Sequence, residues 1–280
     1  MSIADFASLL AKIAVPHEKV QLSKSAQSGT NGGCWVDGFA LPPVAVVPTT
    51  AAACTRTTGA STVLQVGALG QQNGGSGALR LVSGRNGHIA QAAGNGFSTI
   101  LCDRLSHQGG LSGTAGGAQT TNLPTAALTR YTDGVGVWIG LTIHTIVGTT
   151  GTTVTAGYTN QAGTAGRTTV ATVFGGTNFR EPGRMLHLPL QAGDTGVKSV
   201  ESVTLAASTT TVGNFGVVLF KPLVPIVVLH ASYLSTMDPF LNMGGFLPEI
   251  VDDACLFPIF TSGITSATGH SNAEYWFAED

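Results

Sequence analysis

Three acidic residues near the C-terminus are the one local group of carboxylates in the sequence. Glu249, Asp252 and Asp253 lie together in the segment PEIVDD. Two such carboxylates can exchange protons with a substrate when their pKa values differ, and their oxygens can also bind a cation. Because the segment lacks the periodic Asp and Gly spacing of a calcium loop, we expect a solvated turn and no metal site.

Motifs for other common reactions are missing from the sequence. No Gly precedes a Lys, which excludes a phosphate-binding P-loop, and no G-x-S-x-G is present to hold a nucleophilic serine. The histidines never occur two or four positions apart, as metal ligands often do, and we expect them to be solvated or hydrogen-bonded. We therefore predict no catalytic residues, no metal and no cofactor; the protein is not expected to be an enzyme.

The four cysteines are expected to be buried free thiols. Cys34, Cys54, Cys102 and Cys255 match no C-x-x-C or zinc pattern, and four cysteines could pair in three ways. The sequence starts without a basic region or a signal cleavage site, which predicts synthesis in a cytoplasm. Disulfides are disfavoured in that compartment.

The composition favours a β protein that assembles with other subunits. Charged residues make up 10% of the chain, against about a quarter in typical soluble domains, while 38 Gly and 12 Pro suit a fold with many turns. The few basic residues are scattered, so we predict no nucleic-acid partner. No apolar run approaches the ~20 residues that span a bilayer, so no membrane partner is predicted either. Because surface charge keeps proteins apart, its scarcity favours association.

Alternating apolar residues predict strands through the middle of the chain. Val135–Val147 has the clearest alternation, and Thr152–Asn160 and Arg167–Phe174 are predicted to pair across a Gly-rich connection. In Val197–Leu205 the alternation slips near Val200, which indicates a β-bulge. Phe215–Phe220 is apolar on both faces, as in a central strand between packed sheets.

Two segments are predicted to be turns or loops. Gly109–Thr121 has the lowest complexity and is expected to be a long exposed loop. The dipeptide Asn86-Gly87 is typical of a tight hairpin turn.

The N-terminus is predicted to be a helix over Ser2–Val15. An apolar stripe at helical spacing runs along it, formed by Phe6, Leu9, Leu10 and Ile13. The helix either covers its own subunit's sheet or is an arm that packs on a neighbour. At the other end, Tyr275, Trp276 and Phe277 either anchor a subunit interface or pack onto the subunit's own core. These seven side chains are our candidate assembly residues.

The chain is thus divided into an N-terminal helix or arm (1–16), a β-sandwich domain (17–222) and an apolar and aromatic C-terminal segment (223–280). The last segment is expected either to complete the sheet or to form an interface between subunits. The predicted fold class is all-β, a jelly-roll-like sandwich with one short N-terminal helix.

Three segments resemble structural proteins of tailed bacteriophages. They are GYTNQAGTAGRTT, LPLQAGDTGVKSVESVTLAASTTTVGNFGVVLFKPL and LPEIVDDACLFPIF. The resemblance implies a virion protein of the capsid decoration, cement, collar or head-fibre type. It implies a homo-oligomer, with a trimer as one option, that contacts other virion proteins such as the major capsid protein and is made in the host cytoplasm.

Two other functions remain open at this point. A host-binding module would contact a surface glycan through the Gly-rich loops Gly109–Thr121 and Asn160–Gly166. A polysaccharide depolymerase would need two carboxylates ~5–9 Å apart, and the acidic group described above supplies the candidates.

Overall fold

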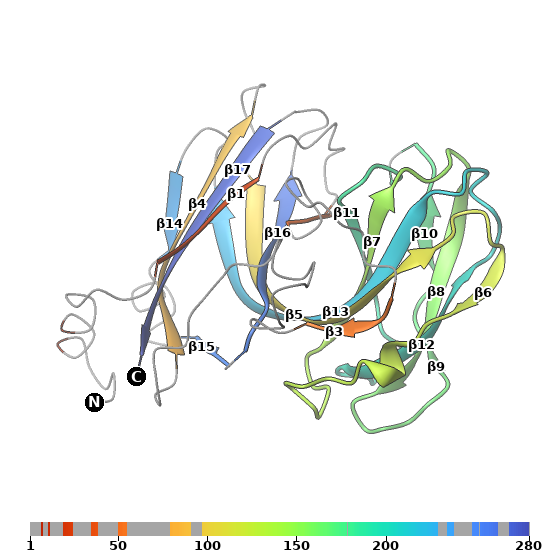
Figure 1. Ribbon diagram of the computed structural model, residues 1–280, viewed down its shortest axis with the longest axis horizontal. Helices are drawn as coiled ribbons and strands as arrows, with labels where there is room; N and C mark the ends of the chain where they lie inside the picture. Colours follow the sequence, from red (N-terminus) through yellow and green to blue (C-terminus); the bar gives the residue numbers. More distant parts are fainter. Residues whose placement is uncertain are drawn as a thin grey trace.

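The computed structural model describes residues 19–24, 35–38, 50–54, 79–90, 97–177, 179–228, 234–237, 248–251, 253–262 and 269–279, with Ala7 and Ala11. This part of the chain is all-β, as predicted, and is built from three antiparallel sheets (Figure 1). A short 3-10 turn, η2 (Leu123–Thr125), precedes the strand β7 (Trp138–Thr145). Among the described residues, no helix is both long and apolar enough to cross a membrane.

The central sheet closes on itself. Its order is β13 (Asn214–Val228), β7 (Trp138–Thr145), β11 (Arg184–Leu188), β2 (Trp35–Asp37), β16 (Leu256–Ser262), β5 (Phe97–Leu111) and β3 (Ala52–Ala53). Because β13 also pairs with β5 along nearly its whole length, the first six strands form a closed ring of hydrogen-bonded neighbours. We call these six strands the ring. Closure gives each of these strands a neighbour on both sides, although β13 beyond Phe220 pairs with β5 alone.

The second sheet lies beside the ring at the right of Figure 1 and holds most of the threonine-rich sequence. We call it the threonine sheet. Its inward side chains, among them Val154, Ala156 and Tyr158, form one apolar cluster with Ile139 and Leu141 of the ring. The strands are β10 (Thr172–Gly175), β8 (Gly151–Asn160), β12 (Val197–Leu205) and β6 (Gly117–Thr120), with β9 (Arg167–Thr168) paired to β8.

The third sheet lies on the opposite side of the ring, at the left of Figure 1, and we call it the terminal sheet. Its Leu81, Tyr275 and Phe277 form an apolar cluster with ring residues such as Leu101 and Ile226. The strands are β1 (Lys19–Lys24), β17 (Gly269–Glu279), β4 (Leu79–Ala90) and β14 (Leu234–Met237), with β15 (Glu249–Ile250) paired to β4.

The long strands β5 and β13 connect the threonine sheet with the terminal sheet. Each of these two strands packs on both sheets and also faces the interior of the ring. Alternation along one strand explains this. On β13, Leu219 packs toward the threonine sheet, whereas Val218 and Phe220 lie in a third cluster. That cluster also contains Phe257 and Ile259 of β16 and fills the ring.

Most of the predicted strands are confirmed. β7 lies within Val135–Val147, and β9 and β10 both pair with β8. β12 spans Val197–Leu205 and its register against β8 shifts on both sides of Val200, as the slip in alternation predicted. Every side chain from Phe215 to Phe220 that the pattern placed in the core is buried.

Two turn predictions were wrong. β5 continues to Leu111 and β6 begins at Gly117, so Gly109–Thr121 is mostly sheet with a short connection. Asn86-Gly87 lies inside β4, where it pairs with β17 on one side and β14 on the other. Pairing on both edges of a strand outweighs the turn preference of a dipeptide. The predicted N-terminal helix lies outside the described residues except for Ala7 and Ala11, which are helical, and it remains a prediction.

Candidate functional site: a buried polar network on the long strand

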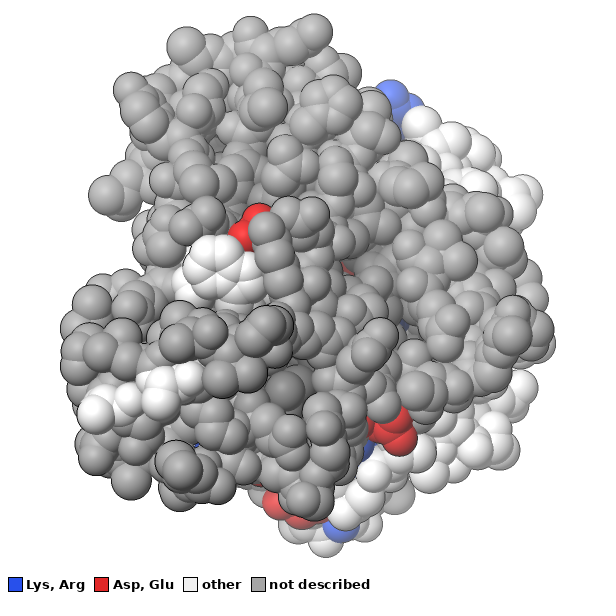
Figure 2. All heavy atoms as spheres, turned by 60° about the vertical axis from the view of Figure 1, so that its left-hand side comes forward, with Lys and Arg blue, Asp and Glu red and all other residues white. Residues whose placement is uncertain are grey.

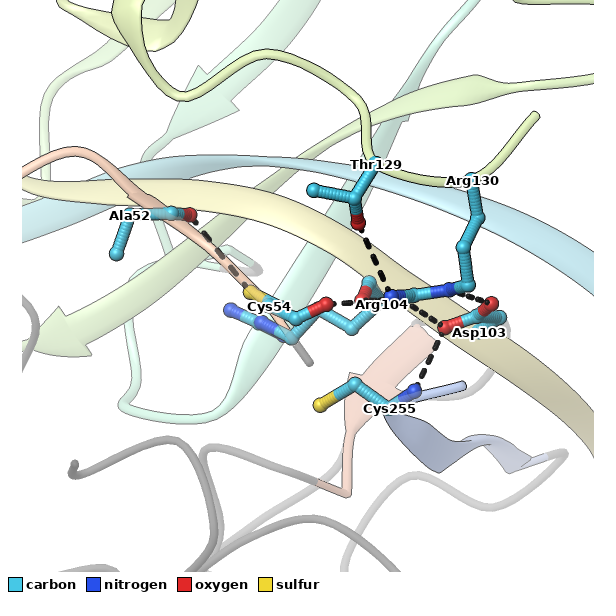
Figure 3. A network of polar contacts seen from close by, with 7 residues as sticks. All are labelled: Ala52, Cys54, Asp103, Arg104, Thr129, Arg130 and Cys255. Atoms are coloured by element: carbon cyan, nitrogen blue, oxygen red, sulfur yellow. Dashed lines mark hydrogen bonds and ion pairs between the residues drawn. The ribbon is translucent and has the colours of Figure 1, made fainter. Parts of the chain in front are cut away.

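A buried ion pair between Asp103 and Arg130 is the centre of a polar network (Figure 3). Arg130 Nε donates to Asp103 Oδ2 at 2.9 Å and Arg130 Nη2 donates to Asp103 Oδ1 at 2.7 Å. The Asp103 side chain is 0% exposed and the Arg130 side chain is 4% exposed. This two-pronged geometry matches the planar guanidinium to the planar carboxylate, so both charges keep strong hydrogen bonds after they leave water.

Backbone groups from distant segments complete this pair. Arg130 Nη2 also donates to the carbonyl of Cys54 at 2.8 Å, and the amide of Cys255 donates to Asp103 Oδ1 at 2.8 Å. Burial raises the pKa of Asp103, and the hydrogen bonds and charge of Arg130 oppose that shift. The pair therefore connects β5, the segment at 129–130, the end of the β3 segment and the turn before β16.

A second buried ion pair lies within the ring. Arg104 Nη1 donates to Asp37 Oδ2 at 2.8 Å, and both side chains are at most 1% exposed. Thr142 Oγ1 donates to the same carboxylate oxygen at 2.9 Å. Arg104 Nε donates to His107 Nδ1 at 2.9 Å, and the guanidinium lies 5.3 Å from the centre of the Phe257 ring. Because an arginine can only donate, Nδ1 of His107 is the acceptor and the proton of the neutral imidazole is on Nε2.

Three of the four cysteines lie beside these pairs as buried free thiols, as predicted. Cys34 is outside the described residues. The Sγ of Cys54 donates to the carbonyl of Ala52 at 3.9 Å, and the Sγ of Cys102 donates to the carbonyl of Ile100 at 3.6 Å. Burial raises the pKa of Cys54, but its neighbours Cys255, His107 and Arg104 together hold that pKa well below its usual value. The pKa of Cys255 is raised well above its usual value by the neighbouring Cys54 and by burial.

This network is built to hold strands together. Its charged side chains are closed off from solvent, so a substrate cannot reach them without opening the ring. Among the described residues, no group of three or more His, Cys, Asp or Glu is placed to hold a metal ion. We call the two ion pairs with their hydrogen-bonded neighbours the buried polar network.

A second charged cluster lies at one end of the threonine sheet. Asp194 accepts hydrogen bonds from the Tyr158 hydroxyl, from Arg167 Nε at 2.9 Å and from Asn160 Nδ2 at 2.7 Å. Its side chain is 4% exposed. These hydrogen bonds lower the pKa of Asp194 to about 2, and the bond from Tyr158 has the largest effect. The cluster fixes the turn after Asn160, whose side-chain oxygen accepts from the amide of Thr164 at 2.9 Å.

We expect Asp194 to make the protein sensitive to acid. An Asp in an unfolded chain has a pKa of about 3.9, so the folded state, with its lower pKa, is favoured above about pH 4. That stabilisation is lost as the pH falls toward about 2. Urea unfolding at several pH values should show a steeper loss of stability in this window for the parent protein than for Asp194→Asn. Parallel curves for the two proteins would contradict the assignment.

The acidic group suggested by the sequence is only partly brought together. Glu249 is 54% exposed and pairs with Arg80 at 3.0 Å. Asp253 lies in the turn before β16 with φ of 62°, and Asp252 is outside the described residues. Glu249 thus lies on the surface strand β15 and Asp253 in a half-buried turn, so the expected solvated turn is found only in part.

The candidate assembly residues at the C-terminus do not all face outward. Tyr275 and Phe277 are fully buried between the terminal sheet and the ring, so the interpretation as interface anchors was wrong for these two side chains. Alternation along β17 places Trp276 on the other face, where it is partly exposed. Phe6, Leu9, Leu10 and Ile13 lie outside the described residues, and their role as an arm stays a prediction.

The sequence analysis did not identify the members of the buried polar network. Asp37, Arg104 and Arg130 are far apart in the chain, and no spacing rule connects them. One signal was available: Asp103-Arg104 interrupts an otherwise apolar and neutral stretch, FSTILCDRLSHQ. Charged residues inside a strand that is buried on both faces must be paired, so this dipeptide could have predicted partners from elsewhere in the chain.

Comparison with solved structures finds, among others, VP2 of infectious bursal disease virus at low similarity. No protein-family model matches the chain, and no curated protein matches it. The crystal structure of an infectious bursal disease virus VP2 subviral particle is 10% identical over 94% of this chain and 82% of that chain, with a TM-score of 0.17. The crystal structure of the T13 IBDV viral particle is 10% identical over 98% and 83%, with a TM-score of 0.19. Superpositions at these scores support no conclusion about this chain.

Proposed function

We propose that this protein is a non-enzymatic structural subunit of a virion, of the decoration, cement, collar or head-fibre type found in tailed bacteriophages. It assembles with copies of itself and with other virion proteins in a jelly-roll-like sandwich architecture. The observation that supports this most strongly is the outer face of the threonine sheet.

That face is lined by small hydroxyl side chains. On β8, Thr153, Thr155 and Thr159 point away from the core, while Val154 and Tyr158 between them are fully buried. Such side chains lose little rotamer freedom when covered and allow two surfaces to approach closely. A face of this kind is suited to contact with another protein.

The neighbouring strands extend the same face. Thr204 lies directly opposite Thr155, and Val173 lies opposite Thr153 with 67% of its surface exposed. The carboxylate of Glu201 on β12 accepts hydrogen bonds from Thr159 at 2.9 Å and from Ser199 at 2.5 Å. This charge is therefore already held by local donors and is less of an obstacle to a partner surface than a free carboxylate.

Charged residues make up only 10% of the sequence, so the chain carries few charges that would oppose association. The described residues that can be seen in Figure 2 include a few acidic and basic side chains. A standard interface buries about 800 Å² on each partner and can be stable without a buried ion pair. Together with the resemblance to phage virion proteins, this favours a structural role over the glycan-binding and depolymerase alternatives.

A charge placed at the centre of the outer face tests the proposal. Thr155→Lys should fold normally, because its side chain points to solvent in the isolated subunit, but should weaken self-association by at least about tenfold, since the ammonium would be buried without a partner. Sedimentation velocity over a range of concentrations measures this. Gln191→Lys adds the same charge in an exposed turn and should associate like the parent. Equal association by all three proteins would contradict the proposed interface.

A further inference from the structure

Strand β6 forms one edge of the threonine sheet. The sheet is paired in the order β10, β8, β12 and β6, so β6 has β12 on one side and, among the described strands, no neighbour on the other. It lies at the right-hand border of Figure 1. Three of its residues, Gly117, Ala118 and Thr120, are exposed. An open sheet edge presents backbone groups that can pair with a further strand.

The backbone groups of Ala118 and Thr120 point toward this open edge. The amide of Thr121, the residue after β6, donates to the carbonyl of Glu201 on β12 at 2.9 Å. Because successive residues of a strand direct their N–H and C=O groups to opposite sides, Thr120 faces away from β12, and Ala118 does so as well. In the described part of the chain, no hydrogen bond to the N–H or C=O of these two residues is found.

No charge or proline protects the edge. Natural proteins usually guard an open edge with charged side chains, proline, a bulge or a covering segment. The sequence Gly109–Asn122 contains neither a charged residue nor a proline. The one long side chain of β6, that of Gln119, is bound to Ser112, whose amide donates to Oε1 at 2.7 Å and whose carbonyl accepts from Nε2 at 3.0 Å. The side chains of Ala118 and Thr120 are small, so a further strand can approach.

We propose that two copies of this chain pair through β6, antiparallel, about a twofold axis at Gln119. Ala118 of one copy then lies opposite Thr120 of the other, and the two residues exchange N–H to O=C hydrogen bonds in both directions. The axis repeats this pair, so every outward backbone group of Ala118 and Thr120 gains a partner. A second copy presents this edge with the matching spacing and no charge, whereas a different protein would need an open, neutral edge of its own.

This pairing joins two threonine sheets into one continuous sheet. Ala118 lies opposite Thr204, and Thr204 lies opposite Thr155, so the outer faces of the two copies become one surface. Because β6 has only 4 residues, the edge contact alone is weak and is strengthened when the outer faces also bind. The inference rests on the proposed self-association, but it concerns the edge of the threonine sheet and not its outer face.

Mixing two cysteine variants of the full-length protein tests the register of the pair. In the proposed dimer the Cα atoms of position 118 and of position 120 in the other copy are about 5.5 Å apart, which a disulfide can span, whereas like positions are diagonal neighbours. A mixture of Ala118→Cys and Thr120→Cys, oxidised under native conditions, should therefore give a disulfide-linked dimer. Either variant alone should give much less. Peptide mapping without reduction identifies the linked positions.

A proline at the edge provides an independent test. Thr120→Pro removes an N–H that points away from β12, so the subunit should fold like the parent, which thermal unfolding checks. Each Ala118–Thr120 pair loses one hydrogen bond, and the proline ring obstructs the approaching strand. Self-association in sedimentation velocity, measured over a range of concentrations, should therefore weaken by at least about tenfold.

The opposite edge of the same sheet supplies the matched control. Val173 of β10 lies opposite Thr153 of β8, whose carbonyl accepts from the amide of Ala206 on the β12 side at 2.9 Å. The backbone groups of Thr153 therefore face β12, and those of Val173 face away from β8. Val173→Pro thus removes an outward N–H from the other edge, and this variant should associate like the parent.

The results separate the edge from the outer face. A parent protein that stays monomeric, or a mixture that gives no more linked dimer than either cysteine variant alone, would overturn the proposal. A link from position 118 or 120 to a different protein in assembled particles, with none between copies, would assign the edge to another partner. Thr155→Lys changes only the outer face and should leave the mixed crosslink intact. If Thr155→Lys weakens association while the mixture gives no crosslink, the edge pairing is wrong and the proposed function stands. The crosslinking result decides even if Thr120→Pro does not fold.

Discussion

Replacing Asp103 by Asn should lower the free energy of unfolding by about 3–5 kcal/mol, because Arg130 would then remain buried without an opposite charge. Asn keeps the shape of the side chain and an oxygen for the amide of Cys255. Its NH₂ group, however, would point toward the donors of Arg130. Since typical domains are stable by about 5–15 kcal/mol, a loss of this size should be clear in urea or thermal unfolding of the parent and the variant.

A surface ion pair in the same protein is the control. Glu249→Gln removes the partner of Arg80, but Glu249 is 54% exposed, so water and salt already weaken this pair. We expect a change below about 1 kcal/mol. Equal effects of the two substitutions would show that the buried polar network does not hold the strands together as described.

Gly148→Ala should destabilise the protein by about 3 kcal/mol or more, at the upper end of what overpacking usually costs. A Cβ at position 148 would lie 1.4 Å from the carbonyl oxygen of Thr209 and 2.3 Å from its carbonyl carbon. Both atoms belong to backbone. Thr209 is itself fully buried, and its hydroxyl accepts from the amide of Gly148 at 3.1 Å. The backbone segment after β7 and the turn after β12 would have to move away from each other at this contact.

Gly151, three positions further on, provides the matched control. A Cβ there would meet no atom within 4 Å, and its φ is not in the left-handed region. Gly151→Ala should therefore change stability by no more than about 0.5 kcal/mol, or raise it slightly by restricting the unfolded chain. Thermal unfolding of both variants measures the difference. A Gly148→Ala protein as stable as Gly151→Ala would contradict the packing at this contact.

The strands of the threonine sheet could be predicted from the sequence because one face is buried and the other is not. In Thr152–Asn160 each apolar residue alternates with a threonine or glycine, and the burial of β8 follows that pattern residue by residue. The slip near Val200 likewise has a direct structural cause, since two register shifts let Val197, Val200 and Val203 all face the core. The local pattern of apolar residues was therefore sufficient to predict a strand that packs on a single core.

The long strands could not be predicted in this way. β5 and β13 face different neighbours along their length, so no single alternation describes them, and β13 continues through Pro222 and Pro225. Gly109–Thr121 was assigned to a loop for its composition, yet its first residues pair with β13 and its last residues pair with β12. The structure of such regions depends on pairing between segments that are distant in the sequence. The amino-acid composition of a segment does not indicate this pairing.

The buried polar network depends on the same distant pairing. The bond between Thr142 and Asp37, like that between Cys255 and Asp103, joins residues more than a hundred positions apart. These contacts exist only because β2, β7 and the turn before β16 meet at β5. For the same reason, Tyr275 and Phe277 were ambiguous in the sequence: their chemistry suits an interface or a core equally, and only the position of β17 against the ring decides.

Quantitative mass spectrometry of virions tests the central claim most directly. Particles would be purified by density gradient from cells in which this chain is made during infection, and its peptides would be counted relative to those of the major capsid protein. The proposed structural role predicts that the chain sediments with intact particles at many copies per particle, and that Thr155→Lys lowers this number while Gln191→Lys does not. A chain absent from purified particles, with all of it free in the lysate, would contradict the proposed function.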